Sequence, residues 1–152
     1  MYAQITSCAV VGVEPEPVRI ETTVGNGRGA FIIVGLPDAA IRESKERVRS
    51  AIQHQGFRFP GGRIVVSLSP ADLPKVGATY DLPIALGIIA ATSDGAIDFE
   101  RFVAVGELSL RGDVLPVRSA LAASMVGEAE EKTCLVAADT CLRFGDNPRV
   151  GG

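Results

Sequence analysis

The amino-acid sequence predicts an α+β domain with two layers, a mixed β-sheet and helices mainly on one face of it. One observation is the order of the expected elements, βββαβαββαβ, in which three strands precede the first helix. Another is an almost uncharged helix that follows a β-branched strand and a polar loop. The chain of 152 residues is long enough for one hydrophobic core and contains no repeat or linker. We therefore expect residues 1–150 to form a single domain.

Three strands are expected at the start of the chain. Residues 3–13 are largely apolar, and this strand should end at residues 14–17, where two prolines cannot donate to a ladder. Residues 18–24 alternate between apolar and polar, as in a half-solvated strand. The glycines of residues 25–29 then lead into a third strand at residues 30–34, which predicts a hairpin turn and a meander of three strands. A phosphate loop would instead open a helix, and no GxxxxGK[ST] motif occurs, so we expect no ATP site in this chain.

An amphipathic helix is predicted from Pro37 and Asp38, which suit a first turn, to about Gln55, with Gly56 as its stop. The strand at residues 63–68 leads into a polar loop at residues 69–79. The buried stripe of the amphipathic helix consists of Ile41, Val48, Ala51 and Ile52.

The helix at residues 81–91 is apolar nearly all round, which is typical of a central core helix. At about a dozen residues it is too short to span a bilayer, which needs roughly 20. Asp81 is interpreted as a helix-start residue, favoured there by the helix dipole. The remaining expected elements are a strand at 102–110, a tight turn at 111–113, a return strand at 114–116, a helix at 118–130, a strand at 133–137 and a short helix at 139–144.

Composition and charge exclude several classes of function. The net charge is −3, so no global attraction to nucleic acid or to an anionic membrane is expected. The three cysteines show no CxxC spacing and read as reduced core residues, which favours a cytoplasmic protein. The first residues lack a charged lead and a long apolar run, so we expect no signal peptide. His54 is the only histidine and has no ligand-spaced partner, so no metal site is expected.

A basic segment stands out against this acidic balance. Residues 41–63 contain six cations and two anions, a local charge of +4. Arg42, Lys45 and Arg49 fall on one helical face. Either this is a solvated face with local Glu–Arg pairs, or it contacts an acidic partner, which would be nucleic acid or a neighbouring subunit. The candidate contact residues are Arg42, Lys45, Arg49, Arg58 and Arg63.

Three long stretches resemble the N-terminal domain of the ComM/YifB family of magnesium-chelatase-like AAA+ ATPases: residues 31–52, 65–90 and 103–121. The resemblance implies that an AAA+ ATPase module follows this domain in the complete protein. ATP and magnesium would belong to that module, and no cofactor is expected in this domain. Members of the family form hexameric rings, so the chain's partners would be further copies of itself and DNA. ComM is linked to branch migration of DNA during natural transformation.

The same stretches are more distantly similar to the proteolytic domain of Lon and the C-terminal domain of the recombination protein RadA. This implies a ribosomal-protein-type fold with a left-handed βαβ crossover, against the usual hand. The nucleophilic serine of Lon falls on Thr79 and its lysine on Leu121. A hydroxyl needs a base to become a nucleophile, which leucine cannot supply, and the nearby Arg118 stays protonated. We therefore expect a degenerate site with no catalytic residue, and a Thr79–Lys75 pair as the residual hypothesis.

The function expected from these observations is that of a non-catalytic accessory domain of a ring ATPase acting on DNA, serving in assembly or in recognition of DNA or a partner. Two alternatives remain open. One is an altered Lon-like hydrolase that uses Thr79, and the other is a pure oligomerisation module.

Overall fold

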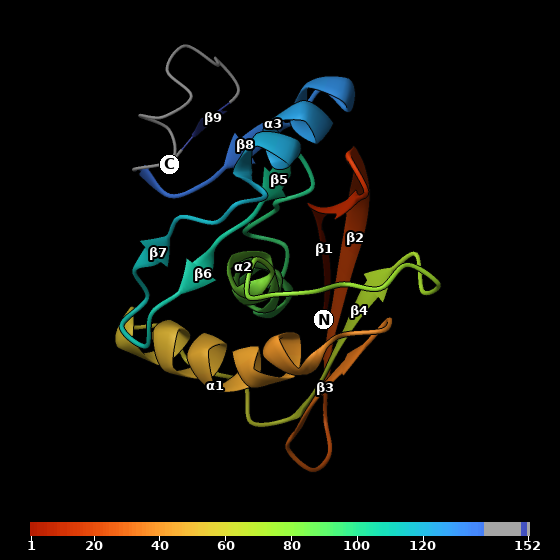
Figure 1. The fold of residues 1–152 in the computed structure, drawn as a ribbon. Helices are drawn as coiled ribbons and strands as arrows, with labels where there is room; N and C mark the ends of the chain where they lie inside the picture. The colour runs from red at the N-terminus through yellow and green to blue at the C-terminus, as the bar shows by residue number, and fades with distance from the viewer. Residues whose placement is uncertain (139–149, 152) are drawn as a thin grey trace.

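A seven-stranded mixed sheet, in the order β3-β4-β2-β1-β5-β8-β9, forms the frame of the computed structural model, and a separate pair, β6-β7, lies beside it (Figure 1). The structure describes residues 1–138 and, for residues 150–151, the backbone. The predicted helix at 139–144 lies outside the described residues. The expected α+β class and mixed sheet are confirmed. The elements are β1 (Tyr2–Val11), β2 (Glu14–Gly25), β3 (Ala30–Val34), α1 (Ala39–His54), β4 (Arg63–Ser69), α2 (Asp81–Thr92), β5 (Phe102–Ala104), β6 (Glu107–Leu108), β7 (Val114–Leu115), α3 (Ala120–Ala129), β8 (Thr133–Leu135) and β9 (Val150–Gly151).

The predicted end of the first strand and start of the second differ from the structure. β1 ends at Val11 and β2 begins at Glu14, so β2 runs through both Pro15 and Pro17, which pair in register with Val10 and Cys8 of β1. On its other side β2 pairs with β4 only from Arg19 onward. The prolines therefore lie where β2 has one neighbouring strand among the described residues. A proline is tolerated at such an edge, because its missing N–H leaves no ladder bond unmade.

The predicted hairpin at residues 25–29, and with it the meander, is wrong. β4 lies between β2 and β3 in the sheet, antiparallel to β2 and parallel to β3. The glycine-rich connection therefore passes the start of β4 instead of closing a tight turn. A Cβ atom on Gly62 would lie 2.0 Å from the carbonyl oxygen of Gly25, so only glycine permits this approach of two backbones.

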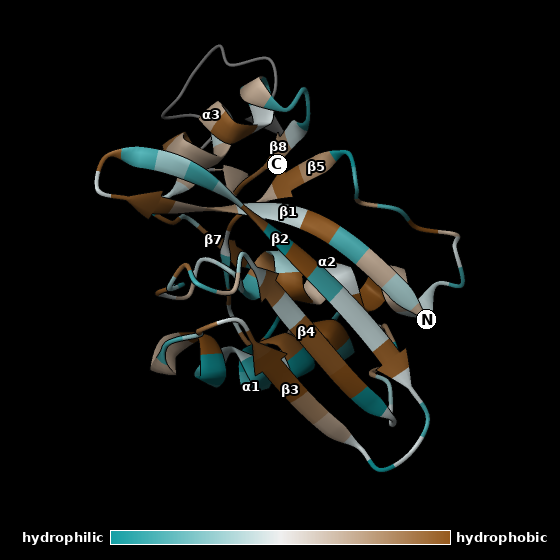
Figure 2. Cartoon of the chain, turned by 90° about the vertical axis from the view of Figure 1, so that its right-hand side faces the viewer, coloured by the Kyte–Doolittle hydropathy of each residue, from teal (hydrophilic) through white to brown (hydrophobic). Residues whose placement is uncertain are grey.

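The helices lie on both faces of the sheet. α1 and α2 contribute Val48 and Ile88 to a core that includes Ala104, whereas α3 contributes Ala123 to a core that includes Val103. Because successive residues of a strand face opposite sides, α3 packs on the face opposite to α1 and α2. In Figure 2 the strands β1, β2 and β4 pass in front of α2. Two of the three described helices thus share one face, as expected, and α2 is central, with most of its residues buried.

The strand predicted at residues 102–110 is divided into β5 and β6. The division occurs at Gly106, whose N–H donates to the carbonyl of Thr79 (2.9 Å) and whose carbonyl accepts from the N–H of Leu82 (3.0 Å). The chain leaves the sheet here because its backbone bonds to the residues at the start of α2. None of the helices in the described residues is long and apolar enough to cross a membrane.

Candidate functional site

Two hydroxyl groups meet where the loop before α2 approaches the start of α3. The Oγ1 atom of Thr79 lies 2.5 Å from the Oγ atom of Ser119, the N-cap residue of α3. Both residues line a groove of about 680 Å³, which Val10, Val76 and Pro116 also line. This is the position at which similarity to Lon places a nucleophile.

The lysine nearest in sequence to this hydroxyl pair, Lys75, is used elsewhere. Its Nζ donates to the carbonyl oxygens of Gly35 (2.8 Å) and Leu68 (3.0 Å), and also to that of Pro70. The side chain is buried, and burial lowers the pKa of the ammonium group. The Thr79–Lys75 pair therefore does not form in the structure, because the ammonium group of Lys75 donates its hydrogen bonds to three backbone carbonyls instead.

A single carboxylate fastens the same loop to α1. Asp38 is the N-cap of α1, where its Oδ1 accepts from the N–H of Ile41 (2.9 Å), and its Oδ2 accepts from the N–H of Gly77 (2.9 Å). The backbone N–H of Asp38 also donates to the carbonyl of Lys75 (3.2 Å). The wall of the groove is thus held to the first turn of α1. Leu121, the other position of the degenerate dyad, is 55% exposed on α3.

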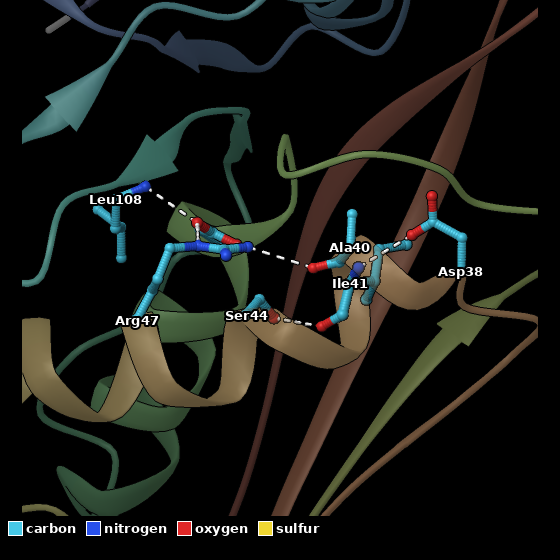
Figure 3. A network of polar contacts seen from close by, with 7 residues as sticks. Asp38, Ala40, Ile41, Ser44, Arg47 and Leu108 are labelled. Atoms are coloured by element: carbon cyan, nitrogen blue, oxygen red, sulfur yellow. Dashed lines mark hydrogen bonds and ion pairs between the residues drawn. The ribbon is translucent and has the colours of Figure 1, made fainter.

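The side chain of Asp81 is completely buried and binds Arg47 of α1 through both oxygens, with Nε at 2.6 Å and Nη2 at 3.1 Å. Figure 3 labels Arg47, with its bond to the carbonyl of Ala40, and Leu108. Its Oδ2 also accepts from the N–H of Leu108 in β6 (3.1 Å). Burial raises the pKa of Asp81, against the opposing effects of Arg47 and the Leu108 N–H, and the bond to Asp81 raises the pKa of Arg47. Asp81 therefore joins three elements, a role the sequence does not reveal because its partners are far away along the chain.

The charges of α1 fall on different sides of the helix. With 3.6 residues per turn, Arg42, Lys45 and Arg49 lie on one flank of its buried stripe. Arg47 lies on the other flank, towards α2 and β6, where Glu43 and Glu107 add to the negative charge around it. The predicted common face therefore exists, and Arg47 does not belong to it. We call Arg42, Lys45 and Arg49 the basic flank.

Phe59 links the basic flank to the two remaining candidate arginines. The guanidinium carbon of Arg49 lies 4.5 Å from the centre of the Phe59 ring, and this ring packs on Phe31 of β3. Arg58 precedes Phe59, and Arg63 begins β4. The structure thus brings Arg49 to the loop that carries Arg58 and leads to Arg63, while Arg42 extends the row by about 10 Å along α1.

The five candidate cations are available to a partner. Lys45 is half-buried, and Arg42, Arg49, Arg58 and Arg63 are exposed. The ion pairs of the described residues are Arg47–Asp81 and Lys132–Glu130, and neither includes any of the five. In the same part of the chain, no group of three or more His, Cys, Asp or Glu side chains is placed to hold a metal ion.

The mixed sheet and the helices that pack on it fit a Lon-like α+β domain. Lon protease 1 of Bacillus subtilis is 27% identical over 120 residues, a match that covers 74% of this chain and 15% of that protein. The family described as subunit ChlI of Mg-chelatase matches residues 20–140, and the chain belongs to this magnesium-chelatase-like family.

Its relatives include two bacterial proteins of greater length. YifB of Salmonella typhimurium, described as uncharacterized, is 38% identical over 138 residues, and the competence protein ComM of Haemophilus influenzae is 39% identical over 136 residues. These matches cover 90% and 89% of this chain. They cover 27% of each relative, so the chain spans about a quarter of the length of the relatives it matches.

Proposed function

We propose that this chain is a non-catalytic accessory domain of a magnesium-chelatase-like ring ATPase that acts on DNA, and that its basic flank, with Arg58 and Arg63, contacts the DNA backbone. Membership of the ChlI family supports the ATPase, with ATP and magnesium bound by other parts of the complete protein. The name of the relative ComM, a competence protein, supports a role in DNA uptake or recombination.

The observation that carries the proposal is that the basic flank makes no ion pair with any described residue. Glu46 lies within one turn of Arg42 and Arg49 on the same helix, yet the ion pair of α1 is that of Arg47 with Asp81, on the other flank. Cations without a carboxylate partner attract phosphate groups and release counterions on binding. The chain as a whole is acidic, so such an attraction would be local to this surface.

The test reverses the basic flank and compares it with an equal change of charge elsewhere. The variant R42E/K45E/R49E should bind a labelled DNA duplex at least about tenfold more weakly at about 50 mM salt, and its affinity should depend less steeply on salt. The control R19E/R101E/R118E makes the same change of net charge at three exposed arginines, which lie in β2, before β5 and before α3. Fluorescence anisotropy of the 152-residue chain gives both affinities. Equal weakening by the two variants would leave only a net-charge effect and would contradict the proposal.

The non-catalytic part of the proposal follows from the surroundings of Thr79. Its hydroxyl bonds to another hydroxyl, and the ammonium group of Lys75 is held by three carbonyls, so no amine is in place to remove the proton. We expect no cleavage of a fluorescent protein substrate and no labelling of Thr79 by a hydroxyl-directed covalent probe. Cleavage that disappears in Thr79→Ala would instead establish the altered hydrolase.

A further inference from the structure

We propose that the groove next to the loop of Arg58 binds a single-stranded nucleic acid, with Phe57 as the platform on which one base stacks. The groove has a volume of about 670 Å³ and lies between the glycine-rich connection at residues 25–29 and the loop before β4. This inference rests on the proposed function, since the basic flank would bind the phosphates of the nucleotides next to the stacked base. Residues that line the groove include Asn26, Phe57, Arg58, Gly61, Ser93 and Ile97.

Phe57 is both exposed and fixed in place. Its side chain is 47% exposed at the wall of the groove. Its N–H donates to the carbonyl of Ile52 (3.1 Å) across Gly56, whose φ of +86° closes the end of α1. A half-exposed aromatic ring on a well-defined turn leaves apolar surface in water at no gain to the fold. A stacked base would cover this surface, and every base offers a flat face for it.

The charges around the groove favour a polyanion. Arg58 lines the groove directly beside Phe57, and Arg63 pairs in register with Gly25 at its edge. None of the described residues that line the groove is an aspartate or a glutamate. Asp94 and Asp98 are sequence neighbours of the lining residues Ser93 and Ile97, after the end of α2. Their negative charge would repel phosphates, so the phosphate backbone would lie on the side of the groove formed by Arg58.

The chemistry of the platform distinguishes a single strand from a duplex. In a duplex both faces of each base are stacked on neighbouring base pairs, so no face is available to Phe57. In a single strand a base can leave its neighbours and lie on the ring at little cost. A duplex can therefore contact the basic flank through its phosphates, but it gains nothing from Phe57.

The experiment measures binding of a labelled oligothymidine of about 20 nucleotides and of a duplex of equal length to the 152-residue chain. Phe57→Ala should weaken the single-strand complex about tenfold and leave the duplex complex unchanged. Phe57→Trp should keep the affinity for the single strand. Leu121→Ala, which removes a similarly exposed apolar side chain on α3, is the matched control and should change neither. Thermal unfolding of each variant verifies that it is folded.

The outcomes separate this inference from the proposed function. Loss of binding in R42E/K45E/R49E together with wild-type binding in Phe57→Ala overturns the platform and leaves the basic flank in place. Equal loss of single-strand and duplex binding in Phe57→Ala also overturns it. Weakened single-strand binding in Phe57→Ala, with no effect of the basic-flank variant on either ligand, supports the platform and contradicts the proposed phosphate contacts. Displacement of the oligonucleotide by polyglutamate of equal charge would identify an acidic peptide as the ligand and overturn the proposal.

Discussion

The guanidinium group of Arg47 in α1 donates two hydrogen bonds, at 2.6 and 3.1 Å, to the buried carboxylate of Asp81 in α2. The Nη2 atom also donates to the carbonyl of Ala40 (3.2 Å), so this nitrogen bonds both the carboxylate of Asp81 and the backbone of α1. Asp81 in turn accepts from Leu108 of β6. This pair joins α1 to α2 on the flank of the helix opposite to the basic flank.

Asp81→Ala should lower the free energy of unfolding by about 3 kcal/mol, because the change breaks a buried ion pair and leaves the Leu108 N–H without its acceptor. Asp81→Asn keeps a carbonyl oxygen for Leu108 and should cost less. Urea unfolding followed by circular dichroism measures both changes. If the two variants were equally stable, the bond to Leu108 would contribute nothing.

Lys75→Met should destabilise the fold by about 2 kcal/mol at pH 7, since three buried carbonyls lose their donor. The difference from wild type should grow as the pH rises towards 10.5, the ordinary pKa of lysine. The reason is that the folded-state pKa is lowered, so between that value and 10.5 the unfolded chain binds more protons and wild-type stability rises with pH. Urea titrations at neutral and alkaline pH test this. A difference that stayed constant with pH would refute the lowered pKa.

Gly62→Ala and Gly61→Ala form a matched pair at the crossing of the two glycine-rich segments. At Gly62 the new methyl group would lie 2.0 Å from the Gly25 carbonyl oxygen, whereas at Gly61 it would meet nothing within 4 Å. We expect Gly62→Ala to cost about 2 kcal/mol and Gly61→Ala less than about 0.5 kcal/mol, as read from thermal unfolding. Similar melting temperatures for the two variants would show that the two backbones do not approach so closely.

The elements of this fold are largely predictable from local sequence, and their pairing is not. Asp38 and Gly56 mark the limits of α1, and the apolar residues of α2 indicate its central place, because capping and burial are encoded within a few positions. A glycine-rich connection such as residues 25–29, by contrast, looks the same whether it closes a hairpin or passes the end of another strand. The prolines of β2 were misleading for a related reason, since their tolerance depends on where β4 stops.

The candidate site likewise has features that can be predicted from local sequence and features that cannot. The spacing of Arg42, Lys45 and Arg49 is enough to place them on one face, because a helix fixes that geometry. The partners of Arg47 and Lys75 are not predictable from spacing, since Asp81 and the carbonyls of Gly35 and Leu68 reach them only in the folded chain. Phe57 and its groove were missed altogether. The sequence signal that points to it is an aromatic residue directly after a helix-terminating glycine and directly before an arginine.

The two carboxylate oxygens of Asp38 bind two different segments of the chain, the first turn of α1 and the loop before α2. One planar carboxylate thus connects the N–H of Ile41 in α1 with the N–H of Gly77, two residues before Thr79. We therefore expect a displacement of the first turn of α1 to move Gly77, which lines the groove of Thr79 and Ser119, along with it.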